Sequence, residues 1–385
     1  MYRPCDATQS GLPVHALSYA QPVVATTHPL NSICPYYTMF PLHFPVAALR
    51  RAEPQQWVMD PFCGRGTTNL AARLRGANTV GLDSNPVAVA LAAAKLTSVE
   101  PQQVMNEARE LIAQPAGVVP EGEFWARCFH EATLREICSL RDGLMKGGDT
   151  PERVFLRAIV LGALHGPLTK SKPSYLSNQA PRTFAPKPRY AARYWSERSL
   201  AAPEVDTIEV LAPRIERYLS RPAPEIMSVV RLADSREVAS FDDLPGIDWF
   251  VTSPPYYGMK TYLQDQWLRL WFLGGPAEVD YTHPASQLGH SSAGEFAAGL
   301  RTVWKNLHSV ANPGARLILR FGGINDRSAD PVEIVKESLR GSGWTVKTLR
   351  RAPHIDNGRR QVNQFGPGRK DPRQEYDVYC RPETG

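Results

Sequence analysis

The sequence predicts an α/β fold with a mainly parallel sheet and one helical insertion. Two consecutive strand and helix units carry this prediction. In the first, the apolar run 57–60 precedes a helix at 67–75, and in the second, a strand at 79–83 precedes a helix at about 86–96. Strands that alternate with helices in this way form parallel sheets. From residue 101 to 226 the spacing of apolar residues becomes helical, which predicts the insertion.

Strand patterns return after the insertion and complete the expected sheet. Apolar runs predict further strands at 229–233, 249–252, 316–321, 344–351 and 375–380. Helices are expected at 264–272 and 295–307, and another begins where Asp330 and Pro331 supply a capping residue and a first-turn proline. The sheet therefore draws on both ends of the chain.

Composition restricts the class of protein. The chain has 385 residues, of which 43% are hydrophobic, enough for a large core. Its six cysteines are scattered without disulfide or zinc-ligand spacing, so we expect neither a disulfide framework nor a metal site. The first residues lack a signal-peptide pattern, and no apolar stretch reaches the roughly 18 residues of a membrane span. We expect a cytoplasmic protein without a membrane partner.

A basic stripe stands out within the insertion. The net charge of +6 is modest, but cations outnumber acids strongly between residues 165 and 198, where aromatic residues are interleaved with them. Such a stripe suits a polyanion. Lysines and arginines could neutralise phosphates, and Asn, Gln or Arg can read base edges. The candidate DNA-binding residues are Lys170, Lys172, Asn178, Gln179, Arg182, Lys187 and Arg189.

The loop DPFCGRGTT, residues 60–68, joins the first strand to its helix. Its glycines allow the backbone to approach a ligand closely. Asp60 at the strand end would repel a pyrophosphate but suits a cationic amino group, and Asp83 ends the next strand where ribose hydroxyls can be bound. These features favour a phosphate-free adenosyl cofactor, S-adenosylmethionine.

A second loop, TSPPYY at 252–257, follows another apolar strand. A base amino group becomes nucleophilic when its N–H bonds point at acceptors, and the Ser253 hydroxyl and the Pro254 carbonyl can serve as these acceptors. Pro255 stiffens the loop, and Tyr256 can stack on a base rotated out of the duplex. We therefore interpret residues Ser253, Pro254, Pro255 and Tyr256 as the catalytic loop.

These motifs resemble the DNA amino-methyltransferases, the group that methylates N4 of cytosine or N6 of adenine. DPFCGRGTT is similar to their cofactor loop, GLDSNP at 81–86 to their ribose-binding strand end, and TSPPYY to their catalytic loop. The segment 28–45 resembles the stretch that covers the methionine moiety, LADSREV at 232–238 the strand end beside the adenine, and the segments NGRRQVNQFG and QEYDVY the last strands.

The resemblance implies a Rossmann-like class I methyltransferase fold that binds S-adenosylmethionine. The cofactor residues it implies are Asp60, Pro61, Phe62, Gly64, Gly66, Thr67, Asp83, Ser84, Asn85 and Asp234. Serine at the start of SPPY is usual for enzymes that methylate N4 of cytosine, so site-specific methylation of DNA cytosine is the leading prediction. A cognate restriction endonuclease is a possible partner.

Three alternatives stay open at this stage: adenine N6 in DNA, a base amino group in RNA, and a catalytically silent DNA-binding protein of the same fold. The expected organisation is an N-terminal extension at 1–27, a catalytic domain formed by 28–100 and 227–385, and an insertion at 101–226 that recognises the target.

Overall fold

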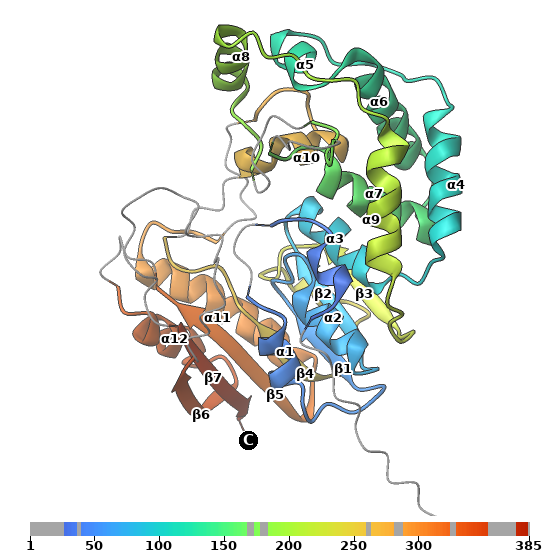
Figure 1. Ribbon diagram of the computed structural model, residues 1–385. Coiled ribbons are helices and arrows are strands. Elements are labelled where there is room, and N and C mark those ends of the chain that lie inside the picture. The colour runs from blue at the N-terminus through green and yellow to red at the C-terminus, as the bar shows by residue number, and fades with distance from the viewer. Residues whose placement is uncertain are drawn as a thin grey trace, which may run out of the picture.

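A single mixed sheet forms the centre of the protein (Figure 1). The computed structural model describes residues 27–36, 40–167, 173–177, 184–258, 263–280, 288–323, 329–352 and 375–383. Seven strands of this part form the sheet in the order β3-β2-β1-β4-β5-β7-β6. They are β1 (Trp57–Asp60), β2 (Asn78–Asp83), β3 (Ser228–Leu232), β4 (Ile247–Thr252), β5 (Ala311–Gly322), β6 (Trp344–Arg351) and β7 (Glu375–Pro382).

The direction of the strands confirms the predicted fold class. Strands β3, β2, β1, β4 and β5 pair in parallel, whereas β7 runs antiparallel to both β5 and β6. This order, with an antiparallel strand inserted next to one edge, is that of a Rossmann-like class I methyltransferase. Parallel sheets place their ligands beyond the carboxyl ends of the strands, so the strand ends are where a site is expected.

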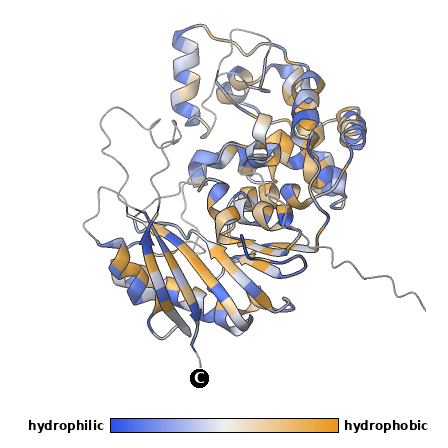
Figure 2. Cartoon of the chain, turned by 60° about the horizontal axis from the view of Figure 1, so that its bottom comes forward, coloured by the Kyte–Doolittle hydropathy of each residue, from blue (hydrophilic) through white to orange (hydrophobic). Residues whose placement is uncertain are grey.

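Helices cover both faces of the sheet. Alternate residues of the central strands enter two hydrophobic clusters: Val58 and Val251 belong to one, and Met59 and Phe250 to the other. The first face packs against α1 (His43–Ala48), α2 (Thr67–Leu74) and α3 (Pro86–Leu96), and the second against α11 (Ala293–Ser309) and α12 (Pro331–Leu339). In Figure 2 the strands carry hydrophobic stretches interrupted by hydrophilic residues.

The predicted helical insertion forms a group beyond one end of the sheet (Figure 1). It comprises α4 (Pro101–Ile112), α5 (Glu123–Cys128), α6 (Glu131–Lys146), α7 (Pro151–Ala163), α8 (Pro188–Glu197) and α9 (Thr207–Leu219). Helix α10 (Trp267–Phe272) comes later in the chain but packs on this group, because the Trp125 and Trp271 rings lie 4.6 Å apart. The division into domains stays a prediction.

Most predicted elements are confirmed to within two residues at each end, and three larger differences remain. The predicted helix 264–272 consists of a 3-10 turn, η3 (Leu263–Gln266), followed by α10. Strand β5 begins five residues before its predicted start, since Ala311 already pairs with Ile247 of β4. Helix α8 was not predicted, because it lies at the end of a Pro-rich stretch whose Pro188 occupies its first turn. Two further 3-10 turns are η1 (Pro29–Ser32) and η2 (Val238–Phe241).

Candidate active site

The loop from β1 to α2 is shaped by two glycines with different surroundings. Gly64 and Gly66 have φ angles of +50° and +73°, in the left-handed region that favours glycine. A Cβ on Gly66 would lie 2.7 Å from the Ala92 Cα, so Gly66 lets α2 and α3 pack closely. At Gly64 the nearest atom would be Tyr36 Cε1 at 4.0 Å. Gly64 is therefore the glycine with room for a ligand beside it.

Asp60 is fully buried at the end of β1 and has an unsatisfied oxygen. Its Oδ1 accepts hydrogen bonds from the Phe62 backbone N–H at 3.1 Å and from Thr252 Oγ1 at 2.5 Å. Its Oδ2 has no hydrogen-bond partner among the described residues. Burial raises the pKa of Asp60 to about 7, although the bonds from Thr252 and Phe62 and the nearby Thr68 hydroxyl oppose the shift. A cationic N–H donor would satisfy this oxygen.

Asp83 braces the same loop from the end of β2. One carboxylate oxygen accepts a hydrogen bond from the Gly64 N–H at 2.8 Å, and the other accepts one from the Asn85 N–H at 2.9 Å. Burial raises its pKa to about 6, against these two bonds. Asn85 caps α3 by accepting a bond from the Val87 N–H. Ser84, between Asp83 and Asn85, is partly buried.

Tyr36 is a site residue that sequence reasoning missed within the 28–45 segment. Its hydroxyl accepts a hydrogen bond from Asn85 Nδ2 at 2.9 Å and also bonds the Gln266 side chain. The Oε1 atom of Gln266 is buried without a partner in the described structure. Tyr36 therefore joins the segment before β1, the end of β2 and the turn that precedes α10.

Two buried basic residues, Arg65 within the loop and Lys95 of α3, were also missed by sequence reasoning. Arg65 is 7% exposed and donates from Nη1 to the Cys34 carbonyl at 3.4 Å, and Lys95 is 1% exposed and donates to Asn31 Oδ1 at 3.3 Å. Neither forms an ion pair with a described carboxylate, and Arg65 Nε has no partner there. Burial lowers the pKa of Arg65 to about 10, and burial together with repulsion from Arg65 lowers the pKa of Lys95 well below its ordinary value. An anion would compensate this charge.

The catalytic loop predicted at Ser253 to Tyr256 leaves the sheet beside the Asp60 loop. Strands β1 and β4 are neighbouring and parallel, with Met59 paired to Phe250, so both loops emerge at the same edge. Thr68 Oγ1 donates to the Val251 carbonyl at 3.1 Å, and Thr252 donates to Asp60, which ties the loops together. In the loop, Pro254 is buried, whereas Ser253 and Pro255 are partly buried.

Tyr256 is held by the last strands of the sheet. Its hydroxyl donates to Glu375 Oε1 at 2.9 Å, its ring meets Phe321 edge-on at 5.3 Å, and it shares a hydrogen bond with the Ser253 side chain. Burial and the neighbouring Glu375 carboxylate raise the pKa of Tyr256. The tyrosine is thus neutral and fixed in place, and it orients Ser253.

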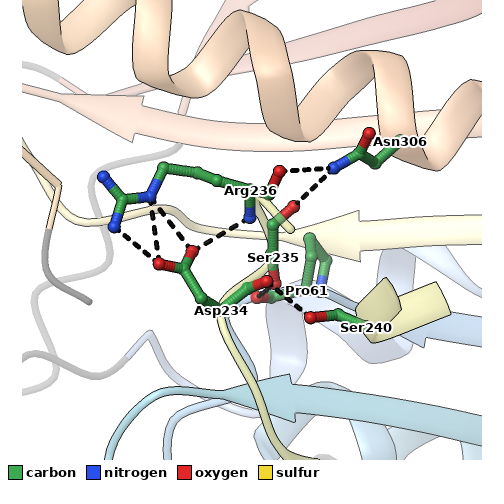
Figure 3. A network of polar contacts seen from close by, with 6 residues as sticks. All are labelled: Pro61, Asp234, Ser235, Arg236, Ser240 and Asn306. Carbon is green, nitrogen blue, oxygen red and sulfur yellow. Dashed lines mark hydrogen bonds and ion pairs between the residues drawn. The ribbon is translucent and has the colours of Figure 1, made fainter. Parts of the chain in front are cut away.

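The carboxylate of Asp234 is engaged by a neighbouring arginine. Arg236 binds both of its oxygens, with Nη2 at 2.5 Å from Oδ2 and Nε at 3.0 Å from Oδ1 (Figure 3). Burial alone would raise the pKa of Asp234, but the bonds from Arg236 lower it overall. The contact between Asp234 and the adenine of the cofactor therefore stays a prediction. In such a contact the Asp234 carboxylate would bind the cofactor and Arg236 together.

The backbone around Asp234 is fastened to the cofactor loop (Figure 3). Ser235 Oγ donates to the Pro61 carbonyl at 2.6 Å, and Asn306 of α11 donates to the Ser235 and Arg236 carbonyls at 3.1 and 3.0 Å. The neighbouring Phe62 packs edge-on against Trp304 at 6.3 Å, and Thr67 is buried in the first turn of α2. The predicted cofactor residues on the ends of β1, β2 and β3 thus form one rim.

Two of the seven candidate DNA-binding residues lie within the described part of the chain. Lys170, Lys172, Asn178, Gln179 and Arg182 lie outside the described residues, as does the NGRRQVNQFG segment. Lys187 and Arg189 are exposed where α8 begins. In the part of the chain described, we find no helix with the length and apolarity of a membrane span. The same residues contain no cluster of three or more His, Cys, Asp or Glu side chains suited to a metal ion.

Comparison with known proteins finds no match to a family model and no curated relative. Among solved structures, TrmN from Thermus thermophilus aligns at 12% identity and a TM-score of 0.33 over 92% of this chain and 52% of its own. The rRNA methyltransferase aviRa from Streptomyces viridochromogenes aligns at 15% identity and a TM-score of 0.35, over 93% of this chain and 91% of its own. Magnesium protoporphyrin IX methyltransferase from Synechocystis PCC 6803, with bound SAM, aligns at 11% identity and a TM-score of 0.32, over 89% of this chain and 78% of its own. The chain spans about half the length of TrmN. Similarity this low does not identify an activity, so the activity is inferred from the chain's own residues.

Proposed function

We propose that this protein is an S-adenosylmethionine-dependent methyltransferase that modifies an exocyclic amino group of a nucleic-acid base, with N4 of cytosine in DNA as the target. The observation that carries the proposal is the hydrogen bond from Thr252 to Asp60. It joins the loop suited to the cofactor with the loop suited to a base amino group, although the two loops are far apart in the sequence. A methyl donor and its acceptor need to be adjacent.

The unmatched charges on the cofactor side suit the methionine end of S-adenosylmethionine. That end carries an ammonium and a carboxylate. The free Oδ2 of Asp60 is matched to the ammonium, and the buried cations Arg65 and Lys95 are matched in charge to the carboxylate. Asp83 would accept hydrogen bonds from the ribose hydroxyls. Tyr36, whose ring lies beside Gly64, would cover the methionine moiety of the cofactor.

The cofactor supplies a methyl group on a positively charged sulfur, ready for in-line attack. The protein's task is then to orient the nucleophile. Ser253 Oγ and the Pro254 carbonyl accept the two N–H bonds of the base amino group, so that its lone pair points at the methyl. Tyr256, fixed by Glu375, holds Ser253 and offers its ring as a wall beside the base. A base must leave the helical stack for its amino group to reach Ser253 and the Pro254 carbonyl.

Serine in SPPY favours cytosine over adenine as the substrate. The amino-methyltransferases that the sequence resembles usually carry serine at this position when they act on cytosine, and aspartate when they act on adenine. Here Ser253 is held by a neutral tyrosine, and the described loop 252–258 contains no carboxylate. The target is therefore proposed as cytosine N4, with adenine N6 and RNA as outcomes to be tested.

Calorimetric titration with S-adenosylmethionine, followed by transfer of its labelled methyl group, tests the proposal. The wild-type protein should bind the cofactor and label DNA, while Asp60→Ala should bind it at least tenfold more weakly. Glu110→Ala, which removes an exposed carboxylate on α4, is the control. Unlabelled DNA together with labelled RNA would reassign the substrate. Absence of cofactor binding by the wild type would refute the proposal.

A further inference from the structure

Two exposed tyrosines stand on the outer side of α8. Tyr190 is 61% exposed and Tyr194 is 39% exposed. Their rings stack, with centroids 6.4 Å apart and planes inclined by 26°. The Arg198 guanidinium lies 3.9 Å from the centroid of the Tyr194 ring. Large aromatic residues grouped in solvent are typical of an interaction surface.

The same side of α8 is positively charged. Lys187, Arg189 and Arg193 are all exposed, and between residues 187 and 198 four cations face one acid, Glu197. Glu197 approaches Arg193 at 3.8 Å and Arg198 at 3.6 Å, with its side chain 60% exposed. Ion pairs so exposed are weak. The cations are therefore available to a polyanionic partner.

The fold does not require these tyrosines. Helix α8 is anchored through its opposite side, where Ala191, Ala192 and Trp195 are buried and Trp195 packs against Phe124 with ring centroids 5.6 Å apart. The helix therefore has a strongly divided surface, with an apolar inner side and an outer side of tyrosines and cations. Substitutions on the outer side should leave the protein folded.

The start of α8 is tied to the chain that leaves the catalytic loop. The Ala185 N–H donates to the Asp265 carbonyl at 2.6 Å, and Trp267 Nε1 donates to the Pro186 carbonyl at 3.1 Å. Residues 185 and 186 directly precede α8, and Asp265 and Trp267 belong to η3 and α10, the elements that follow TSPPYY. In Figure 1, α8 and α10 lie in the same helical group. A partner on α8 is thus positioned relative to the catalytic loop.

We propose that the outer side of α8 binds unpaired nucleotides of the DNA substrate, with bases stacking on Tyr190 and Tyr194 and phosphates contacting Arg189 and Arg193. Stacking on a protein aromatic ring requires a base with a free face, which paired bases within a duplex do not offer. Cations alone would fit any DNA, whereas the tyrosine pair selects unpaired strands. This inference rests on the proposed substrate class, but it needs no cofactor.

Fluorescence anisotropy with a labelled single-stranded oligonucleotide, without S-adenosylmethionine, tests the inference. Y190A/Y194A should weaken binding by about tenfold or more, because both stacking rings are lost. Y190F/Y194F keeps both rings and should bind like the wild type. Affinity for the same sequence as a duplex should change little in either variant. R135A, which changes an exposed residue of α6, is the surface control.

Three results would overturn the inference: unchanged single-strand affinity in Y190A/Y194A, an equal loss for single strand and duplex, or a loss confined to RNA. Thermal melting of each variant checks that the fold is retained. Because these titrations omit the cofactor, their outcome is separate from that of the proposed activity. Normal binding on α8 without methyl transfer would reject the activity alone, and methyl transfer without α8 binding would reject this inference alone.

Discussion

The Thr252 hydroxyl donates a 2.5 Å hydrogen bond to Asp60 Oδ1, across 192 positions of sequence. Both side chains are fully buried, and they end neighbouring parallel strands. Because a hydrogen bond to the carboxylate favours its ionised form, Thr252 acts on the charge of Asp60 as well as on its position. This contact has consequences for cofactor binding that can be measured.

Replacing Thr252 by Val should move the pH dependence of cofactor affinity. The variant removes a bond that opposes the rise of the Asp60 pKa to about 7, so the pKa should rise further. The ammonium of S-adenosylmethionine binds the ionised carboxylate, so affinity falls as pH drops through this pKa, and the variant should lose affinity at a higher pH than the wild type. The other groups that act on Asp60 are Thr68, the Phe62 N–H and Asp83, and these are retained.

Titration calorimetry from pH 5.5 to 8 measures this shift. T302V, at an exposed position of α11, serves as the control for the substitution itself. A uniform loss of affinity at every pH would mean that Thr252 is merely structural.

Ser253→Ala should reduce turnover far more than cofactor affinity. It removes an acceptor needed when the amino nitrogen attacks, and losing one preorganised hydrogen-bonding group costs about a hundredfold in rate. Single-turnover methyl transfer and cofactor titration on the same preparation separate the two effects. If rate and affinity fell together, Ser253 would belong to the cofactor site instead.

Asp83→Ala should weaken cofactor binding, since it removes the proposed ribose acceptor and the brace on Gly64. Asp83→Asn retains one side-chain oxygen and should recover part of the affinity. Equilibrium binding of S-adenosylmethionine to both variants checks this order. An affinity equal to that of the wild type in Asp83→Ala would remove Asp83 from the site.

The protein without cofactor should lose stability as pH rises from roughly 4 to 7. The pKa of Asp60 lies at about 7 in the folded state against an ordinary value of 3.8, so the folded state binds more protons over this interval. Stability from this group is complete below the lower value and lost as pH passes the upper one. Thermal denaturation should show a smaller pH dependence in Asp60→Asn. An unchanged dependence would mean that Asp60 ionises normally.

Gly66→Ala should destabilise the fold by about 2–4 kcal/mol, because it combines a left-handed backbone with an overlap against Ala92. Gly314→Ala is a matched control: its φ is +79°, but its Cβ would meet nothing within 4 Å, so it should cost about 1 kcal/mol. Denaturant unfolding compares the two. Equal losses would leave no role for the contact between α2 and α3.

Local patterns predicted the sheet and both loops well, because buried strands and proline- or glycine-bearing turns are short-range features. The contacts that complete the site were not predictable in this way. Thr252 bonds Asp60, and Tyr256 bonds Glu375, only after the sheet brings distant segments together. Tyr36 lay within a predicted cofactor segment, but nothing in its neighbours singled it out. For Asp234, Arg236 two positions later was a visible signal of an ion pair.

Mass spectrometry of nucleosides tests the central claim most directly. DNA incubated with the protein and isotopically labelled S-adenosylmethionine is digested, and the labelled methyl is located on a base. The account predicts labelled N4-methylcytosine with the wild type and about a hundredfold less with Ser253→Ala. Labelled N6-methyladenine would keep the chemistry and contradict the choice of base. No label on any nucleoside of DNA or RNA, under conditions where the cofactor binds, would contradict the claim itself.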